Sequence, residues 1–170
     1  MDKTIGQPIN IAYIDAANLD NGFRFYADWA LDYKRFRIWL QEKYRVEKAY
    51  IFIGYIKKYQ PLYDLLVAAG FELRFKEVVF QSDGKPKGNC DTDLVMQAME
   101  DFYTGALAQA VLVSSDGDYA PLVKKLHDAN SFHTLLSPSP ERKCSILLKR
   151  VGIRITYLAT KRRILAKRQN

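Results

Sequence analysis

Short apolar runs alternate along this chain with longer segments in which apolar side chains recur every three or four residues. A run of about four to eight apolar residues is typical of a strand covered on both faces, whereas the wider spacing is typical of an amphipathic helix. One further segment alternates apolar and polar residues, as a half-buried strand does. We therefore expect strands over residues 9–14, 49–53, 72–80, 110–113, 132–136 and 153–158.

The helical spacing places helices between these strands. Asp32 can cap a helix that continues to Tyr44, and Pro121 is tolerated in the first turn of a later helix. The full set of expected helices covers residues 32–44, 61–69, 91–103, 119–128 and 141–150. Residues 15–31 are expected to be irregular, and residues 81–90 to form a polar loop with two glycines and a proline.

This order of elements predicts an α/β fold. Strands that alternate with helices pair in parallel, and the connecting helices cover both faces of the sheet. A chain of 170 residues suits one compact domain, and we find no internal repeat and no linker. We expect a three-layer, Rossmann-like fold with a mainly parallel sheet of about five or six strands and helices on both faces.

Composition and charge narrow the classes of function. Cys90 and Cys144 lie far apart and give no sign of a disulfide framework or a zinc site. No apolar run reaches membrane-spanning length and the first residues lack a signal-peptide pattern, so we expect a cytoplasmic protein. The 26 Lys and Arg residues against 19 Asp and Glu residues give a net charge of +7. This charge favours a polyanionic partner without establishing one.

Carboxylates follow two of the expected strands at the point where each strand ends. Asp15 comes directly after the first strand, and Asp116 and Asp118 follow the fourth strand on either side of Gly117. Ligands of open α/β sheets bind beyond the carboxyl ends of the strands, so these aspartates are candidate site residues. Each aspartate alone could be a helix cap or a turn residue, and only their joint placement argues for a site.

Asp91 is a further source of negative charge at this edge of the sheet. It precedes Leu94 and Val95 by three and four residues, which puts it on the apolar face of its helix, toward the sheet. Asp93 lies about 200° round the helix from Asp91 and is expected to face solvent. Asp91 is therefore the stronger candidate of the two.

Several carboxylates at one place require a counter-charge. Two of them about 5 Å apart repel by roughly 3 kcal/mol at an effective dielectric constant of about 20, so such a group takes up protons or binds a cation. Oxygen ligands favour Mg²⁺ or Mn²⁺ over zinc, since His127 and His133 are isolated. Lys85 and Lys87 precede Asp91 and can hold phosphates beside a metal, unless they are solvated loop residues.

Three motifs, in this order, resemble the NYN domain family, which belongs to the PIN-like nuclease superfamily. They are YIDAANL at residues 13–19, KGNCDTDL at residues 87–94 and SSDGDYAPL at residues 114–122. The likeness is strongest to the bacterial LabA-like branch and runs from about residue 9 to residue 158. It divides the chain into an NYN/PIN-like nuclease domain at residues 1–160 and a basic tail at residues 161–170, which could be helical or disordered.

The resemblance implies a Rossmann-like PIN fold, a divalent Mg²⁺ or Mn²⁺ ion and ribonuclease activity, with endonucleolytic cleavage of RNA as the expectation. The metal-binding and catalytic residues would be the four motif carboxylates, Asp15, Asp91, Asp116 and Asp118. The substrate-binding residues would be Asn18, Lys87 and Ser115, to which we add Lys85 because it lies in the same loop before Asp91. Among these, Asn18 would assist the first aspartate, Lys87 would contact phosphate, and Ser115 would orient the Asp116 turn or a water.

Other functions stay open at this point. A non-catalytic nucleic-acid-binding or regulatory module with the same fold would be marked by a lost carboxylate, but all four motif positions are acidic. A phosphohydrolase with an aspartate nucleophile needs a second acid two residues after Asp15, but Ala17 stands there. A dinucleotide-binding enzyme needs a glycine-rich turn after the first strand, and residues 15–18 contain no glycine. DNA as a substrate is not excluded, nor is a homodimer, for which Trp29 and Trp39 are weak hints.

Overall fold

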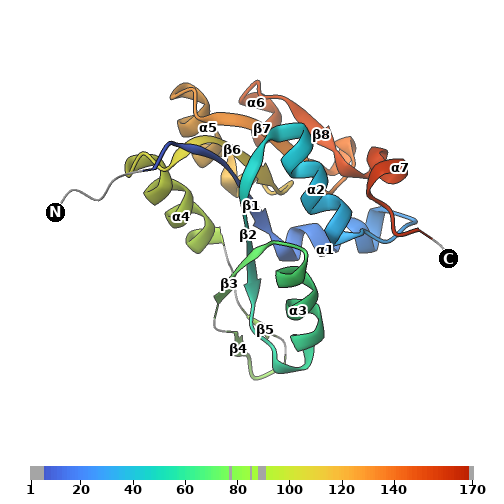
Figure 1. Ribbon diagram of the computed structural model, residues 1–170. Coiled ribbons are helices and arrows are strands. Elements are labelled where there is room, and N and C mark those ends of the chain that lie inside the picture. The colour runs from blue at the N-terminus through green and yellow to red at the C-terminus, as the bar shows by residue number, and fades with distance from the viewer. Residues whose placement is uncertain (1–5, 77, 85, 88–90, 169–170) are drawn as a thin grey trace.

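The computed structural model describes residues 6–76, 78–84, 86–87 and 91–168 of the 170-residue chain. Its centre is a six-stranded sheet in which neighbouring strands are parallel. The strand order β3-β2-β1-β6-β7-β8 places the first strand near the middle of the sheet (Figure 1). The strands are β1 (Ile9–Asp15), β2 (Val46–Gly54), β3 (Glu72–Lys76), β6 (Leu107–Val113), β7 (Phe132–Ser137) and β8 (Ile155–Tyr157).

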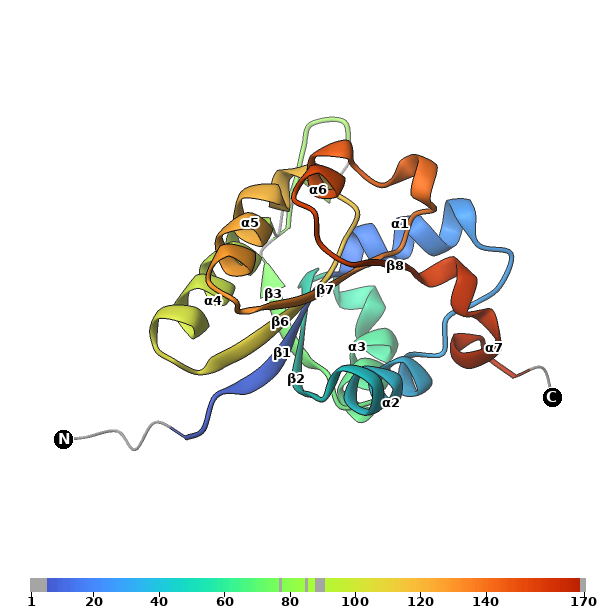
Figure 2. The same ribbon diagram turned by 90° about the horizontal axis from the view of Figure 1, so that it is seen from above.

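Helices pack on both faces of this sheet, which confirms the three-layer α/β fold expected from the sequence (Figure 2). One face carries α1 (Ala16–Tyr26), α2 (Tyr33–Tyr44), α3 (Gln60–Ala68) and α7 (Arg162–Leu165). The opposite face carries α4 (Asp91–Tyr103), α5 (Ala120–Asp128) and α6 (Ile146–Arg150). No described helix is both long and apolar enough to cross a membrane.

Strand β1 shows why the central strands are apolar throughout. Ala12 and Ile14 are buried in the core beneath α1 and α2, whereas Ile11 and Tyr13 are buried in the core beneath α4 and α5. A central strand with helices on both faces has no solvent side, so alternate residues enter different cores. This double burial fixes the position of the strand end, where the candidate site residues begin.

Helix α1 corrects the expectation that residues 15–31 are irregular. Asp15 caps this helix, because its carboxylate accepts a hydrogen bond from the Asn18 backbone N–H at 3.1 Å. Asn21 and Gly22 lie within α1 and lower its intrinsic helix propensity, which hides the helix in the sequence. Gly22 is required by packing, because a Cβ at this position would collide with Pro138. Tertiary contact therefore outweighs propensity here.

The segment expected to be one strand over residues 72–80 divides into two. Strand β3 ends at Lys76, and β4 (Val79–Phe80) pairs antiparallel with β5 (Pro86–Lys87) in a separate two-stranded sheet. The loop expected over residues 81–90 thus contains a strand. Residues 77, 85 and 88–90 lie outside the described residues. The hairpin lies in the lower part of the view in Figure 1.

The last part of the chain also differs from the expected pattern. The helix expected over residues 141–150 begins as a 3₁₀ turn at Glu141–Lys143, and α6 starts only after Ser145, whose side chain caps it. In the basic tail, for which a helix and disorder were both open, Arg162–Leu165 form the helix α7, and Leu165 is fully buried. The Arg35 guanidinium donates to the Ala166 carbonyl at 2.8 Å, so this segment packs against α2.

Candidate metal centre

Two central strands deliver the first carboxylates to one edge of the sheet. Strands β1 and β6 are parallel neighbours, and Ile14 lies opposite Val113. Asp15 follows Ile14, and Asp116 follows Val113 after two serines. Because parallel neighbours end at the same edge, both side chains emerge at the carboxyl end of the sheet.

Three carboxylates come together beside the exit of β6. One side-chain oxygen each from Asp91, Asp116 and Asp118 lies within 4.8 Å of the other two. Asp91 and Asp116 are half-buried and Asp118 is exposed. Asp91 is the first residue of α4, and the packing of this helix against β1 and β6 carries it to the cluster. We call these three residues the aspartate cluster.

The turn that carries Asp116 and Asp118 is fixed by local hydrogen bonds. Asp118 donates its backbone N–H to Asp116 Oδ1 at 2.9 Å, and Asp116 donates its own N–H to the Ser114 hydroxyl at 3.2 Å. Gly117 lies between them, and a Cβ there would collide with the Ser145 hydroxyl. The turn is therefore closely packed against the start of α6, which fixes the backbone from which the two carboxylates extend.

Asp15 lies beside the cluster and is the most buried of the four motif aspartates, with 6% of its surface exposed. One of its oxygens caps α1, and the other accepts a hydrogen bond from the Tyr119 hydroxyl at 3.2 Å. Burial raises the pKa of Asp15 to about 6; the Asn18 N–H lowers it, and the charge of Asp91 raises it further. A nearby cation would offset the cost of keeping this carboxylate charged.

Tyr119 joins Asp15 to the cluster, and sequence reasoning did not single it out. Its fully buried hydroxyl lies 2.8 Å from Asp91 Oδ1 and 3.2 Å from Asp15 Oδ2. A phenol has one proton to donate, so it bonds one carboxylate at a time. Burial and the two carboxylates raise the pKa of Tyr119, which keeps the hydroxyl protonated. Only its position directly after Asp118 could have drawn notice in the sequence.

Asn18 and Ser115 connect α1 to the exit of β6. The Asn18 side-chain oxygen accepts hydrogen bonds from both the backbone N–H and the hydroxyl of Ser115, each at 2.9 Å. The Ser115 hydroxyl also lies 2.9 Å from the Ser139 hydroxyl. Both side chains are thus engaged within the protein, where they align the Asp15 and Asp116 segments.

Asp93, a further charged residue considered in the sequence, lies away from these contacts. Asp93 is exposed and pairs with Lys76 at 4.0 Å, outside the aspartate cluster. Lys87 belongs to β5, where its backbone pairs with Val79. Lys85 and the Lys87 side chain lie outside the described residues.

The carboxylates open onto a groove of about 660 Å³. Asp15, Asn18 and the aspartate cluster line it. Apolar and aromatic residues from the end of β2, from the 3₁₀ turn Lys57–Tyr59 and from α3 line it as well, among them Ile53, Tyr59 and Tyr63. We call this space the aspartate groove. An extended ligand in this groove would contact both carboxylates and apolar side chains.

The donors present fit a hard divalent cation. Among the described residues, one group of acidic, histidine or cysteine side chains is close enough to share an ion. It consists of the three aspartates of the cluster. Carboxylate oxygens without thiolate or imidazole partners suit Mg²⁺ or Mn²⁺ better than zinc. Asp15 adds a fourth carboxylate next to these donors: its pKa is raised mainly by burial, and the charges of Asp91 and Asp116 raise it further.

The fold and the site define an α/β protein whose parallel sheet collects aspartates at its carboxyl edge. The NYN domain model matches residues 10–157, so the chain belongs to the NYN domain family, a nuclease-type family with a PIN-like fold. A crystal structure of a protein of unknown function from Vibrio parahaemolyticus is similar, with a TM-score of 0.69 and 22% identity over 93% of this chain and 96% of that chain. No curated protein matches the sequence.

Proposed function

We propose that this protein is a metal-dependent nuclease that hydrolyses phosphodiester bonds of RNA, with cleavage inside the strand. The observation that carries the proposal is the aspartate cluster, whose three oxygens lie within 4.8 Å of one another on the aspartate groove. Membership of the NYN domain family supports nuclease chemistry at this place. The choice of RNA, and of the LabA-like branch, rests on the likeness of the three sequence motifs.

The four motif carboxylates are the proposed ligands of one or two Mg²⁺ or Mn²⁺ ions. Asp91, Asp116 and Asp118 would hold the ion directly, and Asp15 would complete the site from β1. When bound, such ions supply positive charge that favours deprotonation of water and stabilises the departing oxygen of a phosphodiester.

The other residues of the site have supporting roles in this proposal. Tyr119 would keep Asp15 and Asp91 in place through its hydroxyl, and the Asn18–Ser115 contact would align the two strand exits. Lys85 and Lys87 precede α4 in the chain, and we propose that they hold the phosphates next to the scissile bond. The net charge of +7 supports a polyanionic substrate.

Cleavage of a mixed panel of RNA and DNA in Mg²⁺, Mn²⁺ or EDTA tests this function. We expect cleavage of single-stranded RNA with a metal and none in EDTA. Asp15→Asn is an informative variant, because Asn also caps helices and should preserve α1 while removing the charge. Asp128→Asn, at an exposed carboxylate on α5, is the matched control.

The results separate the proposed nuclease from a binding module. Loss of cleavage in Asp15→Asn with full activity in Asp128→Asn would support the nuclease. Full activity of Asp15→Asn, or of the wild type in EDTA, would rule the mechanism out. RNA binding without cleavage under every metal condition would instead identify a non-catalytic nucleic-acid-binding module.

A further inference from the structure

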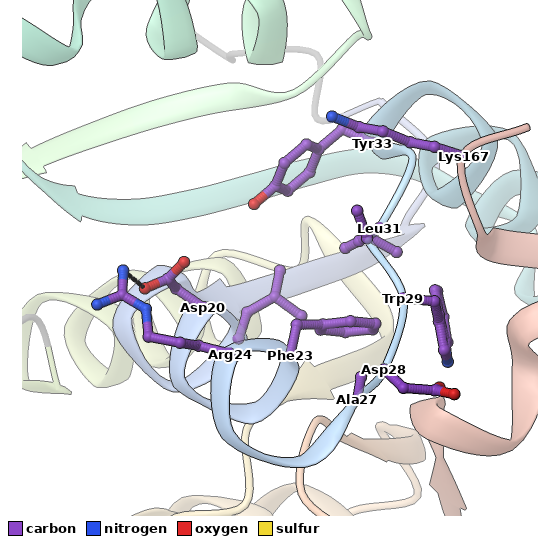
Figure 3. Close-up of a pocket in the computed structure, with 11 residues that line it drawn as sticks. Asp20, Phe23, Arg24, Ala27, Asp28, Trp29, Leu31, Tyr33 and Lys167 are labelled. Carbon is purple, nitrogen blue, oxygen red and sulfur yellow. Dashed lines mark hydrogen bonds and ion pairs between the residues drawn. The ribbon is translucent and has the colours of Figure 1, made fainter. Parts of the chain in front are cut away.

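A second hollow of about 460 Å³ lies next to the aspartate groove. Helix α1, the connection from α1 to α2 and Lys167 surround it (Figure 3). Figure 3 shows Tyr33 and Lys167 on one side, Phe23 and Arg24 on the other, and Trp29 at one end. We call this space the Trp29 hollow. The function derived above assigns it no role.

The Trp29 hollow adjoins the aspartate groove. Leu19, Asp20, Arg24 and Tyr33 line both spaces. Tyr33, at the start of α2, therefore stands at the junction between them. A chain-like ligand with one phosphate at the aspartates can extend past Tyr33 into this second space.

Aromatic side chains give the hollow a surface suited to nucleobases. Trp29 is partly exposed, and the ring of Phe23 packs edge-on against it with centroids 4.8 Å apart. Tyr33 packs edge-on against Phe71 at 6.5 Å. Rings supported in this way are rigid, and an unstacked base binds to such an aromatic face with little dependence on its identity.

The charges around the hollow leave one cation for a phosphate. Asp20 pairs with Arg24 at 2.8 Å, and Asp28 pairs with Arg162 at 3.1 Å, so both acids that line the hollow have an arginine partner. The exposed Lys167 has no side-chain ion pair among the described residues. Its backbone N–H donates to the Ala30 carbonyl at 3.0 Å, which holds this part of the chain against the hollow.

We propose that the Trp29 hollow is a nucleotide subsite that binds the single-stranded substrate beyond the scissile phosphate. The base stacks on Trp29 or Tyr33, and Lys167 contacts the adjoining phosphate. The inference rests on the proposed nuclease function and adds that the substrate is unpaired at this position. Aromatic stacking requires an exposed base face, which a duplex does not offer.

Direct binding of a fluorescein-labelled single-stranded RNA of ten nucleotides, in EDTA to prevent cleavage, tests the subsite. Trp29→Ala should weaken binding about tenfold, the size expected for one lost stacking contact. Lys167→Ala should lower the slope of log affinity against log salt by about 0.7, as one lost phosphate contact on a single strand does. Lys125→Ala removes an equally exposed charge on the opposite face and should change neither value.

Steady-state cleavage kinetics locate the subsite relative to the cleaved bond. With Mn²⁺, Trp29→Ala should raise KM for the ten-nucleotide RNA more than it lowers kcat. Cleavage of a dinucleotide, which has a single phosphate and no nucleotide beyond the two that flank the scissile bond, should respond much less. Equal effects on the two substrates would contradict a subsite beyond the scissile phosphate.

The outcomes distinguish failure of the subsite from failure of the function. Wild-type cleavage together with unchanged RNA affinity in Trp29→Ala and an unchanged salt slope in Lys167→Ala would overturn the subsite and leave the nuclease intact. A wild type that cleaves nothing would overturn the nuclease, while the binding arm would still decide whether the hollow takes a base. Lys167→Ala removes no core packing, so the test stays decisive even if Trp29→Ala fails to fold.

Discussion

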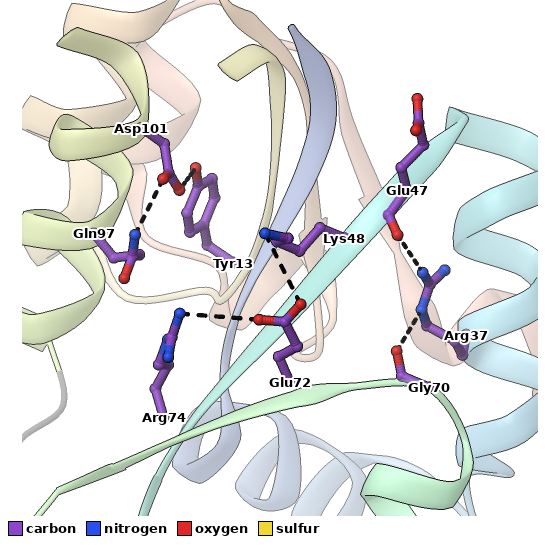
Figure 4. Close-up of polar contacts among 9 residues, drawn as sticks. All are labelled: Tyr13, Arg37, Glu47, Lys48, Gly70, Glu72, Arg74, Gln97 and Asp101. Atoms are coloured by element: carbon purple, nitrogen blue, oxygen red, sulfur yellow. Dashed lines mark hydrogen bonds and ion pairs between the residues drawn. The ribbon is translucent and has the colours of Figure 1, made fainter. Parts of the chain in front are cut away.

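Two regions of this protein pair a tyrosine hydroxyl with buried carboxylates, and they differ in how negative charge is balanced. On α4, the Asp101 carboxylate accepts hydrogen bonds from the Tyr13 hydroxyl at 2.7 Å and from the Gln97 side chain at 3.1 Å (Figure 4). At the metal centre, the Tyr119 hydroxyl lies between Asp15 and Asp91, with Asp116 and Asp118 beyond them.

The difference separates a structural carboxylate from a candidate ligand set. Asp101 has a donor for each side-chain oxygen and lies outside the group of carboxylates that could share an ion. At the metal centre, Asp15 shares the Tyr119 hydroxyl with Asp91, and one oxygen of Asp91 lies within 4.8 Å of oxygens of Asp116 and Asp118. The first region holds a single carboxylate with its donors, whereas the second gathers four carboxylates, whose mutual repulsion a cation would offset.

The largest expected effect is on cleavage. Asp116→Asn removes a proposed ligand and should lower the cleavage rate by more than about a hundredfold. Asp101→Asn, the matched change in the other region, should leave the rate within a few-fold of wild type. A gel-based cleavage assay with Mn²⁺ measures both variants, and comparable losses in the two would break the comparison.

Metal ions should stabilise the protein through only one of the two regions. An ion that binds the folded chain at about one hundred times its Kd adds about 2.7 kcal/mol to the free energy of unfolding. Thermal unfolding should therefore shift upward with Mg²⁺ or Mn²⁺ in the wild type and in Asp101→Asn. The shift should vanish in Asp116→Asn, and its persistence there would place the bound ion elsewhere.

Truncating the structural carboxylate should cost stability instead of activity. Asp101→Ala leaves the buried Tyr13 hydroxyl without its partner, and we expect a loss of about 1–3 kcal/mol in the free energy of unfolding. Urea unfolding of the metal-free protein measures this loss. Asp128→Ala, on the surface of α5, serves as control, and an equal cost there would contradict a specific role for the buried bond.

The smallest expected effects come from removing the hydroxyl groups of Tyr119 and Tyr13, which distinguish the metal centre from the structural carboxylate. Tyr119→Phe keeps the ring but removes the hydroxyl that positions Asp15 and Asp91, and it should weaken metal affinity about tenfold. Tyr13→Phe should leave metal affinity unchanged and reduce stability by about 1 kcal/mol. Calorimetric titration with Mn²⁺ compares them, and recovery of Tyr119→Phe activity at high metal concentration would mark a positioning role.

Much of the fold could be predicted because burial leaves a direct trace in the sequence. The central strands are covered on both faces, so their apolar runs mark them clearly. Helix α1 was not predicted, because Asn21 and Gly22 lower its helix propensity, and the close approach of Pro138 that calls for a glycine at position 22 leaves no local pattern. The β4–β5 hairpin was missed for a related reason, since two-residue strands carry no detectable periodicity.

The candidate site was partly visible for the same physical reason. Asp15 and Asp116 follow apolar runs, and Asp91 is placed by its spacing from Leu94, so chain position alone locates these carboxylates. Asp91 is half-buried and Asp93 exposed, as the helix geometry requires. Their roles as ligands remain proposals for the cleavage and metal-binding measurements to decide.

By itself, the sequence determined the α/β class, the central strands and the edge at which the aspartates gather, because these follow from periodicities of a few residues. Only the tertiary structure decided that Tyr119 reaches two carboxylates from different elements, and that Asn18 holds the turn at Ser115. The Trp29 hollow likewise combines α1, α2 and Lys167 near the end of the chain. Contacts between residues so far apart in sequence depend on how the packed elements meet, and no local pattern records that.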